Sequence, residues 1–392
     1  MTAPHQPFPS GARPRIALAH DWLCGYRGGE AVLDRIARLV SQRYNPTSLY
    51  VMVDDGRPMT PAIDSLPHVA SALQRLPFAS TRLRRWYLPF YLWAASSLSR
   101  QIAAAHSRAP FDLLISTSSA AVKGIQAPPG VPHLCYCHSP ARYVWSQATE
   151  YGHSPGIRSR ARRTGLSLIS KRFKEWDRRT ASNVACFLAN STHTAAQIKL
   201  CYDRDAMVVC PPVRTDFFTP DPSIAREDFW LVVSALEPYK RIDLAITAAN
   251  QANHPLVIAG RGSQRRDLER LAGPTVRFLG RVDDPTLRDL YRRAALLLFP
   301  QVEDFGIVAA EAQSCGLPVV ARRAGGALDI VIDGVNGAFF DAPGARSLLE
   351  AIERAPRHSA QACRESALRF SESSFDEAMT GHIERLLGAR SQ

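Results

Sequence analysis

Two glutamates in the second half of the chain bracket a segment suited to binding a diphosphate. The segment reads Q-V-E-D-F-G-I-V-A-A-E-A-Q-S-C-G-L-P-V-V-A, and its acids are Glu303 and Glu311. A strand is expected to end near Pro300, and Gly306 permits a tight turn before a helix from about Ile307 to Ser314. Free amide groups at a helix start attract a diphosphate. We therefore expect Glu303 beside the diphosphate and sugar, and Glu311 against the ribose hydroxyls.

Two other segments supply groups for the same site. Lys240 and Arg241, in S-A-L-E-P-Y-K-R-I-D, follow the first strand of the second half, where a cation neutralises a leaving diphosphate. Gly260 and Gly262, in A-G-R-G-S, permit a close approach of the nucleotide. Alternatives without a binding role stay open. The two cations could be a solvated pair at a helix start, and the two glycines could form an ordinary strand-to-helix turn. The turn is the better explanation of the glycine pair taken alone.

These groups require parallel strands that end at a common edge. In the first half, the run Ile16–His20 is followed by the glycine pair Gly28 and Gly29 and by a helical pattern over Ala31–Val40, which is how a dinucleotide-type fold begins. Other apolar runs alternate with helical stretches, which predicts an α/β fold with parallel sheets. The expected strands are Phe111–Ser116, His133–Cys137, Ala185–Asn190, Trp230–Ala235, Leu256–Ala259, Val276–Leu279, Leu296–Phe299 and Pro318–Ala321.

The alternation stops and restarts, which predicts two domains. The segment P-P-V-R-T-D-F-F-T-P-D-P-S is rich in proline and aspartate and is interpreted as a linker, and the pattern resumes at about residue 227. We expect an acceptor-side domain over residues 1–212 and a nucleotide-sugar domain over 213–372, facing each other across a cleft. A C-terminal helix in 373–392, with Phe375, Met379, Ile383 and Leu386 on one face, is expected to pack back on the first domain.

Composition narrows the class of protein. The chain has 392 residues and a formal net charge of +12, which favours acidic partners. Its eight cysteines are scattered, so reduced thiols in a cytoplasmic protein are the simpler interpretation. No signal-peptide core and no apolar run long enough to span a bilayer are found, so a soluble or peripheral protein is expected.

The positive charge is concentrated in two segments of the first half. T-R-L-R-R-W-Y-L-P-F-Y-L-W joins bases to aromatic and aliphatic residues, and I-R-S-R-A-R-R-T-G-L-S-L-I-S-K-R-F-K-E-W-D-R-R has far more bases than acids. Both suit an anionic membrane surface, the cytoplasmic face in this case. A core helix with a solvated basic rim is the alternative. Nucleic-acid binding is disfavoured because no recognised reading module is found.

The motifs taken together resemble the family 4 retaining glycosyltransferases, of the two-domain GT-B type with two Rossmann-like domains. E-D-F-G-I-V-A-A-E resembles the E-x7-E signature of that family, S-A-L-E-P-Y-K-R its phosphate-binding segment, and Y-C-H-S-P-A-R-Y the segment that carries its active-site histidine, here His138. The resemblance implies catalytic roles for His138, Lys240 and Glu303. It implies that the donor is bound by Gly28, Gly29, Arg241, Gly260, Gly262, Phe305, Gly306, Ile307, Val308 and Glu311.

The donor and acceptor follow only from the resemblance. H-D-W-L, C-H-S-P-A-R-Y and S-A-L-E-P-Y-K-R are most similar to the branch that transfers mannose from GDP-mannose to surface polysaccharides or polyprenyl-diphosphate-linked precursors. UDP-sugar donors remain open. Many relatives carry an arginine where this chain has Ala235, so a nucleotide-sugar-binding protein without transferase activity is a second hypothesis.

The resemblance also implies a mechanism without a metal or other cofactor. Cationic side chains and helix-start amides would stabilise the leaving diphosphate. The lone D-x-D, Asp203 to Asp205, is interpreted as a turn rather than a metal site. Retention of configuration implies that the acceptor attacks the face from which the diphosphate leaves, and Glu303 then orients the donor sugar without acting as a nucleophile.

Overall fold

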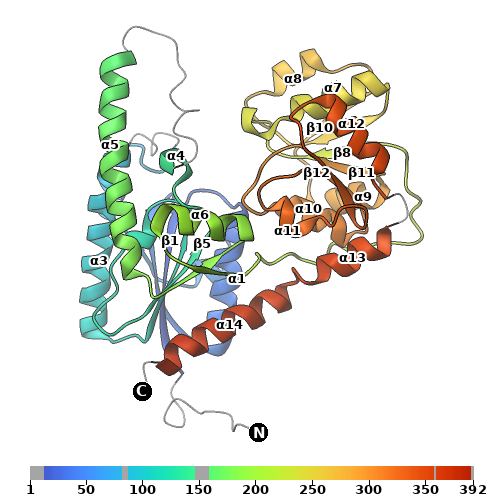
Figure 1. Cartoon of the computed structure of the whole chain (residues 1–392). Helices are drawn as coiled ribbons and strands as arrows, with labels where there is room; N and C mark the ends of the chain where they lie inside the picture. Colours follow the sequence, from blue (N-terminus) through green and yellow to red (C-terminus); the bar gives the residue numbers. More distant parts are fainter. Residues whose placement is uncertain (1–12, 82–86, 146–158, 357–358, 390–392) are drawn as a thin grey trace. The chain divides into compact units, whose positions relative to one another are not determined.

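The chain divides into two compact units, each a parallel α/β sheet (Figure 1). The computed structural model describes residues 13–81, 87–145, 159–356 and 359–389. Unit 1 comprises Met1–Val209 and Asp376–Gln392, and unit 2 comprises Cys210–Phe375. Unit 2 is therefore inserted, in sequence terms, between two parts of unit 1.

Unit 1 contains a sheet of seven parallel strands in the order β3-β2-β1-β4-β5-β6-β7. The central strands are apolar on both faces because helices cover both sides of a parallel sheet. The strands are β1 Arg15–Leu23, β2 Asn45–Asp54, β3 His68–Ala70, β4 Leu113–Ser118, β5 His133–Cys137, β6 Cys186–Ala189 and β7 Ala206–Val208.

Helices pack on the sheet of unit 1. Side chains of α3 and α5 share a buried cluster with Ala17 and Ala19 of β1, whereas α1 contacts β1 and β2. The helices are α1 Gly28–Arg43, α2 Pro61–Asp64, α3 Tyr91–Arg108, α4 Arg142–Trp145, α5 Ser159–Thr180, α6 Thr192–Tyr202 and α14 Glu372–Ala389, which begins in unit 2. Short 3-10 helices lie at Ala72–Arg75, Val122–Gly124 and Ala181–Asn183.

Unit 2 contains a sheet of six parallel strands in the order β10-β9-β8-β11-β12-β13. The strands are β8 Trp230–Val233, β9 Leu256–Ala259, β10 Val276–Gly280, β11 Leu296–Phe299, β12 Val319–Arg322 and β13 Gly337–Phe340. Consecutive strands run outward from β8 to β10 on one side and from β11 to β13 on the other. The strand order therefore reverses between β8 and β11, which is where doubly wound folds bind ligands.

The helices of unit 2 form a layer on each face of its sheet. One buried cluster joins α7 and α12 to Val232 and Ile258, and the other joins α9 and α10 to Leu231 and Leu297. The helices are α7 Ile242–Ala252, α8 Arg265–Leu271, α9 Asp284–Arg293, α10 Ile307–Ser314, α11 Ala327–Ile330, α12 Ala345–Arg354 and α13 Ala360–Leu368, and a 3-10 helix spans Pro238–Lys240.

Three sequence-based expectations need correction. Gly28 and Gly29 form the first turn of α1 rather than a loop before it, because Arg27 already acts as the N-cap. The proline-rich segment after residue 210 is no free linker: Phe218 is fully buried in unit 2, and its carbonyl accepts hydrogen bonds from Ser314 and Arg364. On α14, Leu387 rather than Leu386 is buried with Met379 and Ile383.

Candidate functional site

The reversal of strand order between β8 and β11 in unit 2 brings two predicted catalytic residues together. Lys240 ends the 3-10 helix after β8, and Glu303 lies in the loop after β11. The Lys240 ammonium donates a hydrogen bond to Oε1 of Glu303 within an ion pair, and their side chains are only 12% and 17% exposed. Two residues far apart in sequence thus place one positive and one negative charge at the same edge of the sheet.

The helix α10 begins beside this pair. Gly306 is its N-cap with φ 108°, a conformation that residues with a Cβ rarely adopt. A Cβ on Gly306 would stand 2.9 Å from Cζ of Phe299 in β11. The neighbouring Phe305 is buried, and Ile307 and Val308 form the first turn of α10. The first amides of an eight-residue helix are therefore fixed at the end of β11, as diphosphate binding requires.

Two glycines allow the loops at this edge of the sheet to pack closely. Cβ atoms on Gly260 and Gly262 would stand 1.8 Å from the Ser234 carbonyl oxygen and 2.2 Å from that of Leu236. The loop after β9 therefore packs directly on the loop that leads to Lys240.

A second glycine pair braces the Glu303 loop in the same way. A Cβ on Gly325 would stand 2.3 Å from the Glu303 carbonyl oxygen, and the Gly326 amide donates to that oxygen at 2.9 Å. These glycines were not named as site residues from the sequence. The sequence signal that could have identified them is the glycine pair itself, which follows strand β12 closely.

Glu311 lies on α10, partly buried, next to a tyrosine that sequence reasoning missed. The Tyr291 hydroxyl donates to Oε2 of Glu311 at 3.2 Å. Burial raises the pKa of Glu311 from 4.5 to about 7, while Arg214 and the Tyr291 hydrogen bond oppose that rise. Glu311 is thus a carboxyl group held close to its neutral form before any ligand binds.

Arg241 does not point freely toward the predicted diphosphate site. Its backbone adopts the left-handed conformation with φ 53°, and its guanidinium donates to both carboxylate oxygens of Asp243. This bidentate pair raises the pKa of Arg241. Asp243 therefore competes with any anion for the Arg241 cation.

In unit 1, His138 lies directly after β5 and next to Gly29. A Cβ on Gly29 would stand 3.7 Å from Nε2 of His138, at van der Waals distance, so the start of α1 lies against this ring. Nε2 is buried and has no hydrogen-bond partner among the described residues. Burial, reinforced by the charges of His20 and Arg142, lowers the pKa of His138 to about 3, against the opposing charge of Glu30. His138 is therefore a neutral imidazole that presents an unsatisfied nitrogen.

Residues of H-D-W-L organise the surroundings of His138. His20 shares a 2.6 Å hydrogen bond with Thr117, and its Nε2 lies 3.9 Å from Glu30. The fully buried Asp21 carboxylate accepts the backbone amides of residues 119–122 at 2.6–2.9 Å. Asp21 thus fixes the loop after β4, a structural role that its place after an apolar strand had not suggested.

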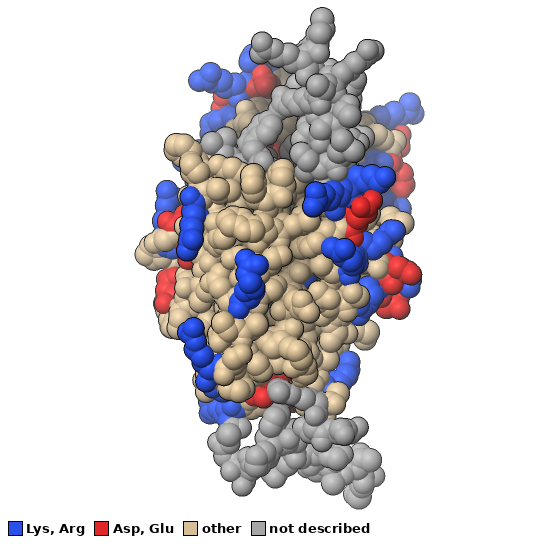
Figure 2. Space-filling model, turned by 90° about the vertical axis from the view of Figure 1, so that its left-hand side faces the viewer, with Lys and Arg blue, Asp and Glu red and all other residues tan. Residues whose placement is uncertain are grey.

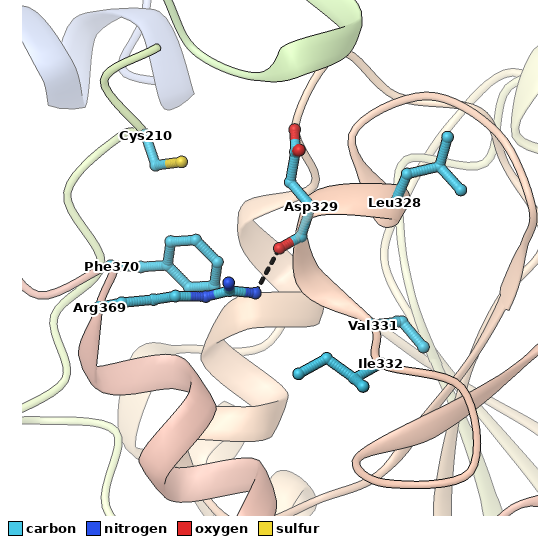
Figure 3. Close-up of a pocket in the computed structure, with 7 residues that line it drawn as sticks. All are labelled: Cys210, Leu328, Asp329, Val331, Ile332, Arg369 and Phe370. Atoms are coloured by element: carbon cyan, nitrogen blue, oxygen red, sulfur yellow. Dashed lines mark hydrogen bonds between the residues drawn. The ribbon is translucent and has the colours of Figure 1, made fainter.

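A pocket of about 320 Å³ in unit 2 holds none of the predicted site residues (Figure 3). It is lined by Cys210, Leu328, Asp329, Val331, Ile332, Arg369 and Phe370. Arg369 donates to the Asp329 carbonyl oxygen at 2.5 Å. Because α11 follows Gly326, this contact supports the loop that braces Glu303.

Two family models match adjoining parts of the chain. The model described as Glycosyltransferase Family 4 matches residues 26–217, and the model described as Glycosyl transferases group 1 matches residues 214–373, which contain Lys240, Glu303 and Glu311. Between them the two models cover residues 26–373, so most of this chain is similar to glycosyltransferases, and residues 26–217 are similar to family 4 in particular.

The relatives of this chain differ in the substrates that their names state. It is 33% identical to the D-inositol 3-phosphate glycosyltransferase of Mycolicibacterium smegmatis over 46% of this chain and 47% of that protein. It is 39% identical to the phosphatidylinositol N-acetylglucosaminyltransferase gpi3 subunit of Schizosaccharomyces pombe, over 29% of this chain and 28% of that one. The matches thus span less than half the length of these relatives.

Solved structures confirm the GT-B fold. Anabaena HepE in complex with UDP is 18% identical, with a TM-score of 0.69 over 94% of this chain and all of that one. The sucrose-phosphate synthase of Thermosynechococcus elongatus is 18% identical, with a TM-score of 0.70 over 96% of this chain and all of the other. The prediction of two Rossmann-like domains is confirmed.

Proposed function

We propose that this protein is a retaining glycosyltransferase that moves a sugar from a nucleotide donor to a saccharide or lipid-linked saccharide. The observation that carries the proposal is the meeting of Lys240 and Glu303 beside the start of α10. A cation, oriented helix amides and a carboxylate are the groups that a departing nucleoside diphosphate and its sugar require. The matches to the two glycosyltransferase models and the UDP-bound structural neighbour support the same conclusion.

In this proposal, each group has a distinct task. Lys240 neutralises the diphosphate together with the amides of Ile307 and Val308, and Glu303 orients the sugar. Glu311 accepts hydrogen bonds from ribose hydroxyls, and the neutral His138 contacts the donor sugar. No metal is assigned a role, because the ammonium and the helix start already supply positive charge at the diphosphate.

GDP-mannose is the donor that we propose. The loops after β9 and β10 present the exposed Arg261 and Arg281, and Nε of Arg261 lies 3.8 Å from where a Cβ on Gly280 would stand. An arginine recognises guanine through the paired acceptors O6 and N7, which uracil lacks. A UDP-sugar is the alternative that the UDP-glucose complex of HepE favours.

Association with an anionic membrane surface is a further part of the proposal. Figure 2 faces the α3–α5 side of unit 1, where blue basic side chains lie on a largely uncharged surface and red acidic ones are few. A groove of about 530 Å³ lies there, lined by Leu88, Pro89, Leu92, Trp93, Ser96, Arg100, Arg172 and Phe173. Apolar walls with two arginines suit the acyl chains and phosphates of a lipid surface.

Part of the basic surface predicted from sequence is not described. Residues 82–86, 157 and 158 lie outside the described residues, as do the side chains of residues 159–169. Within the described part of the chain, no helix combines the length and apolar character needed to cross a bilayer. Sedimentation with anionic and with neutral vesicles tests the association, and equal recovery in both pellets contradicts it.

Thermal-shift measurements with GDP, UDP, GDP-mannose and UDP-glucose test the donor. We expect a larger rise in Tm with the guanine nucleotides. A response selective for uridine nucleotides contradicts GDP-mannose as the donor but agrees with the proposed function. No response to any nucleotide contradicts both the donor and the function. Transfer to a saccharide acceptor, followed by mass spectrometry, then separates a transferase from a nucleotide-sugar-binding protein, which is the hypothesis that Ala235 favours.

A further inference from the structure

Tyr291 connects the core of unit 2 to the carboxylate of Glu311. Its side chain is fully buried in α9, with its ring edge-on to Phe218 at 5.7 Å between centroids. Its carbonyl oxygen accepts a hydrogen bond from Arg226 at 3.2 Å, so both backbone and ring are held. Its hydroxyl donates to Oε2 of Glu311 at 3.2 Å. Within the described part of the chain, no other side chain hydrogen-bonds Glu311.

We propose that Tyr291 is a positioning residue that aims the Glu311 carboxylate at the ribose of the bound nucleotide. This inference rests on the proposed donor site. A tyrosine hydroxyl occupies one oxygen of Glu311 from the core side, which leaves Oε1 to accept hydroxyl groups of a ligand. Because the tyrosine ring is immobilised by packing, the carboxylate loses little further freedom when it binds ribose.

The same contact favours the charged form of Glu311. Burial raises the pKa of Tyr291 well above 10, so this hydroxyl remains a donor at every working pH. Around Glu311, the charge of Arg214 favours ionisation and that of Asp284 opposes it, and these two form an ion pair at 2.9 Å. Arg214 therefore offsets the burial of Glu311 most, and Tyr291 offsets it next, through a hydrogen bond made to the carboxylate itself.

The test is a pH titration of nucleotide affinity, with GDP and UDP as probes in calorimetry. Wild-type affinity is expected to fall as the pH drops below about 7, because a protonated Glu311 accepts fewer hydrogen bonds from ribose. Tyr291→Phe keeps the ring but loses the hydroxyl, so the midpoint of this fall moves to higher pH. At about pH 7 the variant is expected to bind roughly tenfold more weakly, and affinity recovers at about pH 9.

Two comparisons separate positioning from a merely structural effect. Tyr50→Phe makes the same change at a buried tyrosine of unit 1 and is expected to leave the titration unchanged. In the double variant Tyr291→Phe/Glu311→Gln, the tyrosine change is expected to add nothing to the effect of Glu311→Gln, because both act through one carboxylate. Thermal unfolding of each variant checks that it remains folded.

The outcomes distinguish this inference from the proposed function. If wild-type protein binds nucleotide but Tyr291→Phe titrates as wild type, or loses affinity equally at all pH values, positioning by Tyr291 is overturned and the donor site stands. Additive losses in the double variant overturn it as well. If wild-type protein binds neither nucleotide at any pH, the proposed function itself fails.

Discussion

Lys240 and Glu303 neutralise each other across the boundary between β8 and β11, although 63 residues separate them in sequence. An incoming diphosphate must therefore compete with a carboxylate for its cation. The pair also holds both side chains in place before the donor arrives, which lowers the entropy lost on binding. The two residues should consequently respond differently to substitution.

Lys240→Met is expected to weaken GDP binding by about 2 kcal/mol, a factor of about 30, because a charged hydrogen bond to phosphate is lost. Glu303→Gln is expected to leave GDP binding equal or slightly tighter, because it removes the competing carboxylate, and to slow sugar transfer by about a hundredfold. Calorimetry with GDP and turnover with the sugar nucleotide measure the two effects. Equal loss of GDP affinity in both variants would show that Glu303 supports the site rather than competing for Lys240.

Glu311 should also affect stability. Its folded pKa, about 7, lies above its ordinary value of 4.5. Between these pH values the folded protein keeps a proton that the unfolded chain has lost, so this group lowers the free energy of unfolding as pH rises. Glu311→Gln is expected to be more stable than wild type by on the order of 1–3 kcal/mol at about pH 8, and nearly equal at about pH 4.5. Urea unfolding at both pH values measures this; a difference independent of pH argues against it.

His138 should act as a neutral group. Since burial lowers its pKa to about 3, its protonation contributes no inflection to the turnover profile above about pH 5. His138→Ala is expected to reduce turnover by about a hundredfold through loss of a hydrogen bond to the sugar. His68→Ala serves as a control, because that imidazole pairs with Asp54 in β2. A turnover rate for His138→Ala within twofold of wild type would remove His138 from the site.

Gly262 should tolerate no side chain. Its φ lies outside the left-handed region, so the Cβ itself, 2.2 Å from the Leu236 carbonyl oxygen, is the cause of the clash. Gly262→Ala is expected to displace the loop that leads to Lys240 and to weaken nucleotide binding at least tenfold. Gly344→Ala is the matched control, since a Cβ at that position would have no atom within 4 Å. Unchanged affinity in Gly262→Ala would mean that the loop adapts.

The strands and the helix α10 were predictable where the local pattern was strong. The runs His133–Cys137, Leu256–Ala259 and Leu296–Phe299 were predicted with their observed bounds because buried parallel strands are apolar on both faces. The helix over Ile307–Ser314 was predicted from its flanking glycines and proline. The strand β2 was missed because it opens with Asn-Pro-Thr-Ser, which is typical of a turn.

Contacts between side chains on different elements could not be predicted from the sequence. Its spacing does not reveal that Asp243 engages Arg241, or that Tyr291 reaches Glu311 from another helix. Phe218 was assigned to a linker because prolines and aspartates surround it, although it is buried against Ser314 of α10 and Arg364 of α13, which lie 96 and 146 residues later. Such contacts arise only when the sheet is assembled. The domain boundaries and the roles of the site residues remain predictions.

The discontinuity of unit 1 has a consequence for biosynthesis. Arg35 of α1 donates to both carboxylate oxygens of Asp376, at 2.8 and 2.6 Å, and the buried Met379 and Ile383 follow on the same helix. The ribosome makes these residues only after it has completed the whole of unit 2. Until then, the apolar surface of unit 1 that Met379 and Ile383 cover is exposed to solvent. Chaperones can bind this surface during that interval.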